Sequence, residues 1–305
     1  EKGLSKREIL EELKKIEGVY VPELLKDGEK VVKAVVKDFE NAPYPTKLLV
    51  PNIEIVHDRA TLELYRGCAS GCRFCQAGYY YRPIRERSAE KCAEYGKEMI
   101  NNSGFGEISL CSLSTSDYTK IEQLIPMLFD WALKENINVS LPSLRVDNFS
   151  DELMEELKKV RRSGLTFAPE AGTQRLRDAI NKNVTEEEVL RTALKAFDGG
   201  WTSVKLYFMM GLPTETLDEI KGIADLAQKV VDTFYRNPNK EKGKGVQVSV
   251  SCASFVPKPF TPFQWEPQDT PESLNEKQKH LLSSTTSRKI TISYHQSETS
   301  VLEGV

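Results

Sequence analysis

The chain carries at residues 65–78 the run Tyr65-Arg66-Gly67-Cys68-Ala69-Ser70-Gly71-Cys72-Arg73-Phe74-Cys75-Gln76-Ala77-Gly78, in which three cysteines stand four and then three positions apart. Thiolates at these intervals on one loop can ligate three irons of an iron–sulfur cube and leave the fourth iron open to a small molecule. We therefore expect Cys68, Cys72 and Cys75 to be metal ligands.

Two other uses of these cysteines fit the pattern less well. A structural zinc site is normally closed by four ligands, and the nearest further candidates are His57, eleven residues before Cys68, and Cys92, seventeen residues after Cys75. Disulfides pair evenly and need an oxidising compartment, whereas the chain uses only six cysteines in 305 residues. Both stay open as alternatives, and the spacing favours cluster ligation.

The cysteine run resembles the cluster-binding signature of the radical S-adenosylmethionine (radical SAM) superfamily. The stretches at 55–60, 76–78 and 81–88 are similar to an uncharacterised radical SAM family whose longer members carry a cobalamin-binding-like domain upstream. This similarity extends from about Gly18 to the C-terminus. It implies a [4Fe–4S] cluster, S-adenosylmethionine (SAM), an electron donor such as flavodoxin or ferredoxin, and cobalamin bound through a domain absent here.

Length and composition favour one main domain. The chain has 305 residues, is 39% hydrophobic and carries a net charge of -3 from 42 basic and 45 acidic residues that are mixed along it. This balance disfavours general binding of polyanions. No apolar run approaches the length of a membrane span, and the low cysteine usage fits a reducing interior, so we expect no membrane partner and a cytoplasmic location.

The first 60 residues read as a lead-in segment. Apolar residues at helical spacing after Ser5 predict a helix that reaches about Ile16, with Gly18 as its stop. Prolines at 43, 45 and 51 mark an irregular arm over residues 19–60. We expect residues 1–60 to be a linker from a missing upstream domain, and the whole chain to be an internal portion of a larger protein.

Residues 61–305 alternate between strand-like and helix-like runs, which predicts parallel strands in an α/β fold. The six predicted strands are 61–66, 107–113, 137–141, 165–168, 203–209 and 246–253. The predicted helices are 88–101, 119–135, 150–162, 173–181, one from Thr185 and 216–234, and a further start is Thr270-Pro271. Six units are fewer than the eight of a closed barrel, and the resemblance implies an open, partial (β/α)6 TIM-type barrel.

The resemblance places SAM across the C-terminal ends of the strands, where loops vary on a rigid frame. Phe74 matches a position near the adenine, and it is equally suited to packing on the cysteine loop. After the second strand, Ser114 and Ser116 are candidates for holding the amino group of the methionine moiety. Their hydroxyls would equally suit capping of the next helix.

Four further residues follow the later strands. Arg145 is suited to ribose hydroxyls or a carboxylate, or to an ion pair with Asp147. Glu170 can accept hydrogen bonds from ribose, and Arg175 can pair with the cofactor carboxylate or with Glu170; a helix-start ion pair is the alternative for each. Gly211, in a glycine-leucine-proline turn, would bring backbone close to adenine.

Aromatic and basic side chains flank these positions. Residues 254–265 form a proline-rich aromatic loop that would wall a substrate pocket or only close the barrel end. Residues 79–87 suit an anionic or nucleotide-like substrate through Tyr79, Tyr80, Tyr81, Arg82, Arg85 and Arg87. Glu86 and Glu90 interrupt this stretch, which makes a solvated face the more common reading. The remaining cysteines, Cys92, Cys111 and Cys252, are expected to be buried thiols.

The sequence thus predicts a radical SAM enzyme that reductively cleaves SAM to a 5′-deoxyadenosyl radical. Cobalamin-assisted methylation would need the upstream domain, and tRNA methylthiolation would need a second cluster with further cysteines. A non-catalytic iron–sulfur binding or assembly module is the alternative from another class. The sequence does not identify the catalytic residue, the substrate or the oligomeric state.

Overall fold

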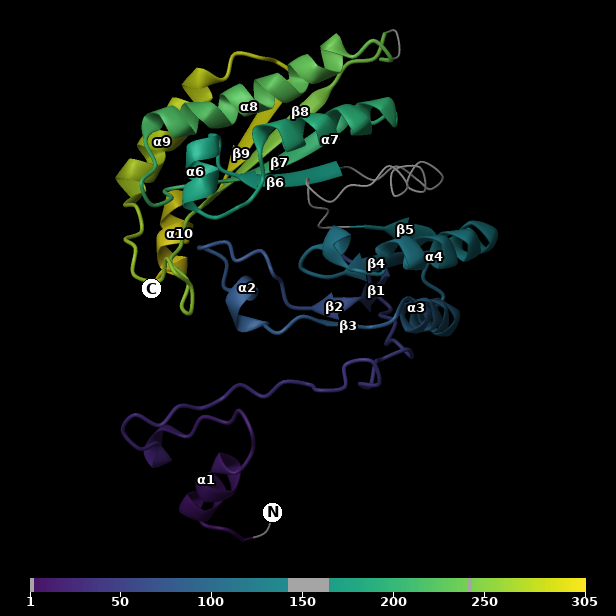
Figure 1. Ribbon diagram of the computed structural model, residues 1–305, viewed down its shortest axis with the longest axis vertical. Coiled ribbons are helices and arrows are strands. Elements are labelled where there is room, and N and C mark those ends of the chain that lie inside the picture. The colour runs from purple at the N-terminus through teal and green to yellow at the C-terminus, as the bar shows by residue number, and fades with distance from the viewer. Residues whose placement is uncertain (1–2, 142–164, 241–242) are drawn as a thin grey trace. The chain divides into compact units, whose positions relative to one another are not determined.

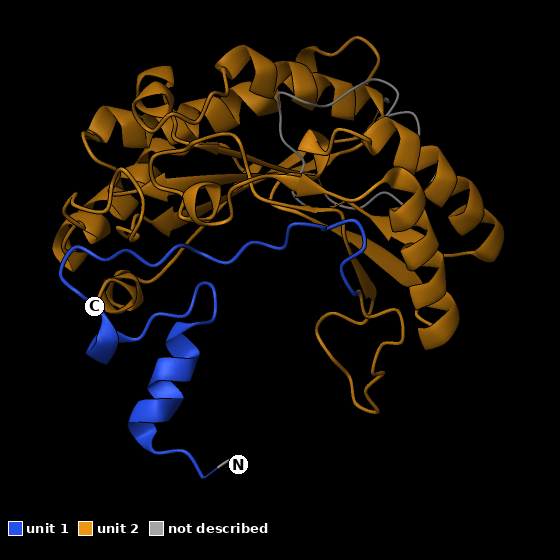
Figure 2. Ribbon diagram, turned by 60° about the horizontal axis from the view of Figure 1, so that its bottom comes forward, with its two compact units in different colours: residues 1–43 blue, residues 44–305 orange. Residues whose placement is uncertain are grey.

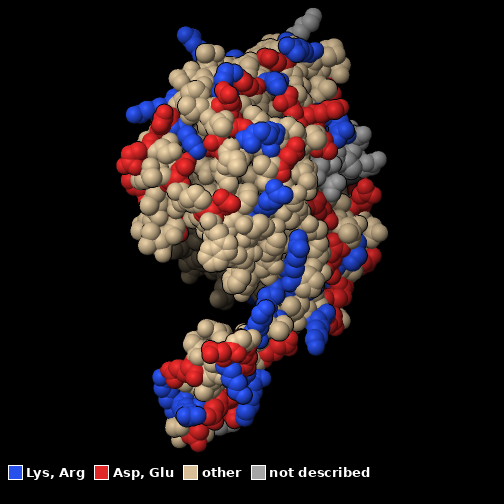
Figure 3. Space-filling model, turned by 60° about the vertical axis from the view of Figure 1, so that its left-hand side comes forward, with Lys and Arg blue, Asp and Glu red and all other residues tan. Residues whose placement is uncertain are grey.

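The computed structural model describes residues 3–141, 165–240 and 243–305, and the chain divides into two compact units. Figure 2 colours unit 1, Glu1–Pro43, and unit 2, Tyr44–Val305. Over the face shown in Figure 3, basic and acidic side chains are interspersed, in line with the small net charge. Within the described ranges, no helix combines the length and the hydropathy needed to cross a bilayer.

Unit 1 contains the helix predicted at the start of the chain. Helix α1 spans Lys6–Lys14, and Ser5 and Glu8 form a capping box at its N-terminus. The short 3-10 helix η1 follows at Pro22–Leu24, and Lys14 donates a hydrogen bond of 2.7 Å to the carbonyl of Leu24. The remaining described residues of this unit form no regular element, as the prolines and polar residues predict.

Unit 2 contains two parallel sheets and one short antiparallel pair. The first sheet has the order β1 (Ala60–Glu63), β4 (Glu107–Cys111), β5 (Asn138–Ser140). The second has the order β6 (Leu165–Glu170), β7 (Ser203–Met210), β8 (Gln247–Ser254), β9 (Ile290–Tyr294). Strand β2 (Tyr65–Arg66) pairs antiparallel with β3 (Arg85–Glu86).

All six predicted strands are present and parallel to their neighbours, with two differences in detail. The predicted strand 61–66 is divided into two. Its first part, β1, pairs with β4 as far as Glu63, and from Tyr65 the chain forms β2, which pairs with β3. Strand β9 was not predicted; it lies at the sheet edge, and its alternating side chains are only partly buried. Among the described residues, β1 pairs only with β4 and β9 only with β8, so the barrel is open.

Helices connect the strands and lie along them (Figure 1). Their bounds are α2 Ala77–Tyr80, α3 Ala89–Ser103, α4 Ile121–Glu135, α6 Gln174–Ala179, α7 Glu186–Asp198, α8 Leu217–Arg236, α9 Pro271–Ser284 and α10 Ser297–Glu303, with the 3-10 helix η2 at Thr115–Asp117. The predicted capping boxes Thr185–Glu188 and Thr216–Glu219 are confirmed, and Pro271 occupies the first turn of α9. The predicted helix 150–162 lies outside the described residues.

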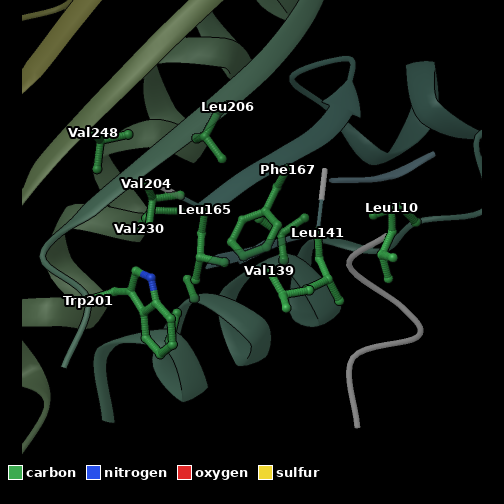
Figure 4. Close-up of a cluster of buried hydrophobic side chains, with 14 of the residues drawn as sticks. Leu110, Val139, Leu141, Leu165, Phe167, Trp201, Val204, Leu206, Val230 and Val248 are labelled. Carbon is green, nitrogen blue, oxygen red and sulfur yellow. The ribbon is translucent and has the colours of Figure 1, made fainter. Parts of the chain in front are cut away.

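One apolar core joins both sheets to their helices. It includes Val139 and Leu141 around β5, Leu165 and Phe167 of β6, and Trp201 before β7 (Figure 4). Strand β7 alternates buried and more exposed positions, as expected when one face of a sheet packs on the core. Burial of these side chains removes apolar surface from water and holds the strand ends in place for the loops that follow them.

The turn after β6 approaches helix α8 at a glycine. A Cβ at Gly172 would lie 2.6 Å from the carbonyl oxygen of Glu219 and still closer to the backbone of Gly222 and Ile223. We therefore expect Gly172→Ala to lower the free energy of unfolding by about 1–3 kcal/mol, because the backbone must shift. Gly106→Ala is the control, since nothing lies within 4 Å of its added Cβ.

Denaturant unfolding of both variants, followed by circular dichroism, measures this difference. Equal stability of the Gly172→Ala variant and the parent would contradict the close approach of the turn to α8.

Candidate cofactor-binding site

The cysteine loop begins directly after β2 and ends at helix α2. Gly67 opens it with φ +98°, and a Cβ there would lie 3.0 Å from the carbonyl oxygens of Tyr81 and Pro83. Only glycine fits this position without strain. The loop therefore leaves the sheet at a fixed angle, which presents the three cysteines beyond the end of β2.

The thiols of the loop are available as ligands. None of the six cysteines is joined in a disulfide; Cys72 is buried, and Cys68 and Cys75 are partly exposed. The backbone N–H of Cys75 donates to the carbonyl of Cys72 at 3.1 Å, which folds the loop into a turn. In the part of the chain that the structure describes, no three His, Cys, Asp or Glu side chains are placed to share a single metal ion.

Phe74 stands next to Cys75 in this loop and is half-buried. It packs against a small buried cluster formed after the strands of the second sheet, composed of Ala171, Leu176, Ile180, Leu212 and Phe255. The packing role weighed for Phe74 is thus present in the structure. Contact with adenine stays a prediction for the same side chain.

Both candidate serines after β4 are buried. Ser114 is 3% exposed, its carbonyl accepts a hydrogen bond from the hydroxyl of Tyr65 at 2.5 Å, and its own hydroxyl has no hydrogen-bond partner among the described residues. A buried polar atom without a partner is costly, so the hydroxyl is suited to a ligand. Ser114 precedes η2 but makes no side-chain cap, so the capping alternative is not seen for it. Ser116 is 7% exposed within η2.

Glu170 ends β6 in an unusual conformation. Its φ of +67° is rare for a residue with a side chain, and the β6–β7 register shifts between Phe167 and Glu170. Its carboxylate pairs with Lys182 at 3.1 Å, and both side chains are largely buried. Backbone strain of this kind is concentrated at functional sites, which makes the strand end a candidate for ligand contact.

Arg175 does not contact Glu170. Its Nε donates to Glu219 at the start of α8, and its Nη2 donates to the carbonyl of Thr214 at 2.9 Å. Although burial disfavours the charged form of Glu219, hydrogen bonds from Thr216 and Arg175 lower its pKa. Of the interactions weighed for Arg175, the helix-start ion pair is therefore observed, while the guanidinium stays partly exposed. Arg145 and Asp147 lie outside the described residues.

Gly211 forms the turn after β7 with φ +79°. A Cβ there would come within 3.2 Å of the Asp269 carboxylate, so only glycine fits without strain. Its N–H donates to Glu215 at 2.7 Å. Lys277 of α9 in turn pairs with Glu215 at 2.8 Å and with Asp269 at 2.6 Å. A charged group thus holds the turn in place; it consists of the side chains of Glu215, Asp269 and Lys277.

The burial of this charged group and the contacts within it shift the pKa values of its members. Burial raises the pKa of Glu215, against the stabilising effect of Lys277. Burial would lower the pKa of Lys277, but the carboxylates of Glu215 and Asp269 raise it. The thiol of Cys252 has its pKa raised to about 12 by burial and by Glu215. Sequence reasoning missed these contacts, because residues from separate loops and from α9 carry no local motif.

The flanking aromatic and basic residues divide into exposed and buried sets. Tyr80 packs between Tyr81 and Phe260, and Phe260 is 66% exposed. Arg82 lies over the ring of Tyr79. Arg87 differs: it is 1% exposed and lies over the rings of Tyr44 and Tyr95, so it is a core residue and not part of a substrate-facing surface.

The other cysteines partly follow expectation. Cys92 and Cys252 are buried as predicted. Cys111 is exposed at the end of β4, after the three buried residues 108–110. The prediction of a buried thiol at 111 is therefore wrong.

The family is decided by the region that contains this site. A sequence model described as the radical SAM superfamily matches residues 62–227, more than half of the chain, and includes all three cysteines of the loop. The chain belongs to the radical SAM superfamily. Its open parallel sheets and its cysteine loop after β2 agree with this membership.

Two relatives of this radical SAM chain come from Methanocaldococcus jannaschii. An uncharacterized protein is 32% identical over 288 residues, which cover 92% of the chain and 58% of that protein. A putative methylthiotransferase is 26% identical over 203 residues, which cover 63% of the chain and 44% of its own length. The radical SAM chain spans about half the length of these curated relatives.

A solved structure shares the fold. The radical S-adenosylmethionine methyltransferase TsrM from Kitasatospora setae, determined with cobalamin and a [4Fe–4S] cluster bound, superposes with a TM-score of 0.54. The match covers 70% of the radical SAM chain and 39% of TsrM, at 13% identity. At this identity the likeness concerns the fold.

Proposed function

We propose that this chain is the core of a radical SAM enzyme, in which Cys68, Cys72 and Cys75 hold a [4Fe–4S] cluster and the strand ends bind SAM. The observation that carries the proposal is the loop of three cysteines directly after β2, within the region matched by the family model. Three cysteines on one loop leave one iron of such a cluster without a protein ligand.

Held by Cys68, Cys72 and Cys75, the cluster would supply the electron for reductive cleavage of SAM to methionine and a 5′-deoxyadenosyl radical. The residues of this chain would bind SAM and orient it. Ser114 would place its buried hydroxyl against the amino group, with Ser116 beside it. Glu170 would accept hydrogen bonds from ribose hydroxyls.

The remaining candidates would shape the rest of the SAM site. Phe74 and the Gly211 turn would enclose the adenine from two sides, Phe74 through its ring and the turn through its backbone. Arg145 is proposed to hold the ribose hydroxyls or the carboxylate of SAM. Arg175 would pair with that carboxylate through the part of its guanidinium left exposed by Glu219. An enclosed site also keeps water from the radical.

Among the reactions that can follow, we propose cobalamin-assisted methylation in the full-length protein, with residues 1–60 as the link to an upstream domain. The likeness to TsrM supports it at the level of fold. Methylthiolation is the second candidate, supported by the putative methylthiotransferase among the relatives. We further propose an electron donor such as flavodoxin or ferredoxin, an anionic or nucleotide-like substrate, and a reducing cytoplasmic setting.

The decisive experiment is anaerobic reconstitution with iron and sulfide, followed by dithionite and SAM. We expect 5′-deoxyadenosine and methionine in equal amounts, measured by liquid chromatography and mass spectrometry. A bound cluster without 5′-deoxyadenosine would instead favour the non-catalytic iron–sulfur module. Failure to bind iron would reject both.

A second prediction concerns Ser114. We expect Ser114→Ala to raise the Kd for SAM by up to about tenfold, because one hydrogen bond to the amino group is lost. Since that hydroxyl has no partner in the described structure, the variant without SAM should be as stable as the parent or slightly more so. Calorimetric titration of SAM and thermal unfolding measure the two effects.

The control is Ser112→Ala in the same turn. Its hydroxyl lies 3.2 Å from that of Thr115, so the change should lower the free energy of unfolding by about 1 kcal/mol. Unchanged SAM affinity in Ser114→Ala would rule out contact between this hydroxyl and SAM.

A further inference from the structure

The backbone of the cysteine loop is hydrogen-bonded to two segments that come much later in the chain. The N–H of Arg73 donates to the carbonyl of Ile180 at 2.9 Å, and the carbonyl of Arg73 accepts from the N–H of Phe263 at 3.2 Å. The guanidinium of Arg73 also donates to the carbonyl of Ala179, 106 residues away in sequence. The loop is therefore joined to the end of α6 and to the loop after β8.

A second set of contacts converges on the peptide just before Cys72. The carbonyl of Gly71 accepts from the side-chain amide of Asn181 at 2.9 Å and from the hydroxyl of Tyr79 at 3.0 Å. The same amide lies 3.4 Å from the carbonyl of Ser70. A carbonyl oxygen has two lone pairs, so both donors can be accepted at Gly71. The orientation of this peptide is thus fixed by two side chains.

Asn181 occupies a special place in the backbone. It follows Ile180, the C-cap of α6, with φ +55°, the left-handed conformation that glycine most often adopts just beyond a helix. Asparagine tolerates this conformation better than most residues with a side chain. Glycine would serve the backbone equally well, but it has no amide to donate to Gly71. Asn183, two residues later, has a similar φ of +52° and is exposed.

We infer that Asn181 is a positioning residue for the cluster: through the Gly71 carbonyl it fixes the peptide that carries Cys72, and so the direction of the Cys72 thiol. This inference rests on the proposed function, since it requires a cluster on the loop. Partners that orient metal ligands typically contribute 10- to 100-fold to metal affinity, and hydrogen bonding around a cluster helps to set its reduction potential.

The test compares Asn181→Gly with the matched control Asn183→Gly. Both changes replace an asparagine of left-handed φ, but only the first removes a hydrogen bond to the cysteine loop. In reconstituted protein, we expect Asn181→Gly to release iron to a chelator roughly tenfold faster than the parent and to shift the midpoint potential of the cluster. Asn183→Gly should match the parent in both measurements.

Tyr79→Phe is the second variant, because it removes the other donor to the same carbonyl. It should also release iron faster than the parent, and the double variant should exceed either single one. Circular dichroism of each variant checks that the fold is retained. If Asn181→Gly does not fold, Tyr79→Phe decides the role of the Gly71 carbonyl by the same two measurements.

Equal iron release and equal potential in the Asn181→Gly variant, the control and the parent would overturn the inference. Failure of the proposed function gives a different result, because the parent itself would then bind no cluster. If the parent holds iron and the variants release it at the same rate as the parent, the cluster assignment stands and only the proposed role of Asn181 is rejected.

Discussion

Cys72→Ala is expected to abolish the formation of 5′-deoxyadenosine from SAM. Cys72 is the buried member of the three loop thiols, so neither water nor a neighbouring thiol from the loop can easily replace it. Removing a residue that hydrogen-bonds to a metal ligand typically lowers metal affinity about 10- to 100-fold. Removing a ligand itself should lower the affinity further. Iron content and product formation after anaerobic reconstitution measure the effect.

The matched control is Cys111→Ala. Cys111 is exposed at the end of β4 and lies outside the loop, so this variant should retain the iron content and the product yield of the parent. Retention of both by Cys72→Ala would reject the assignment of the loop as the cluster site.

Lys277→Met is expected to give the largest loss of stability. Lys277 pairs with Glu215 and Asp269, and the side chain of Glu215 is only 1% exposed. Removing one partner of a buried ion pair leaves an uncompensated charge and costs about 3–5 kcal/mol. Because Asp269 is 30% exposed, we expect a value at the lower end, about 3 kcal/mol. Denaturant unfolding near neutral pH measures the change.

The loss should depend on pH. Burial raises the pKa of Glu215 in the folded state above its ordinary value of 4.5, and loss of Lys277 would raise it further. The folded variant then binds this proton more tightly than the unfolded chain does. Its stability is therefore greatest at and below the ordinary pKa and falls as the pH rises through the folded-state pKa. We expect a smaller difference from the parent at pH 5 than at pH 8.

Two controls separate this effect from the loss of a lysine as such. Lys221 and Asp225 form an exposed pair on α8, and Lys221→Met should change the free energy of unfolding by less than about 1 kcal/mol. Adding Glu215→Gln to Lys277→Met removes the buried charge and should recover part of the lost stability. A Lys277→Met variant as stable as Lys221→Met would contradict the structural role of the group.

The sequence was most informative where the signal is local. Cysteine spacing indicated the loop, the alternation of residue patterns indicated six parallel strands, and Thr185 and Thr216 marked helix starts that the structure confirms. These features depend on residues within a few positions of one another, so a single sequence can show them.

The unpredicted parts depend on contacts between distant segments. Arg175 was considered a partner of Glu170, yet it pairs with Glu219, and Glu170 pairs with Lys182. Which carboxylate an arginine meets is decided by how α6, α8 and the turn at Gly172 pack, and no local pattern contains that information. Arg87 likewise reads as a surface residue until packing places it over two tyrosine rings.

The contacts of Arg73 have a consequence for how the protein is made. Residues 68–75 are synthesised early, but Ile180 and Phe263, which bind the backbone of Arg73, follow much later. At typical translation rates Phe263 leaves the ribosome roughly 10–40 s after Cys75. During that interval the nascent thiols lack their final geometry. We therefore expect iron to be held only after residue 263 has emerged, so chains that end before residue 263 should fail to retain iron.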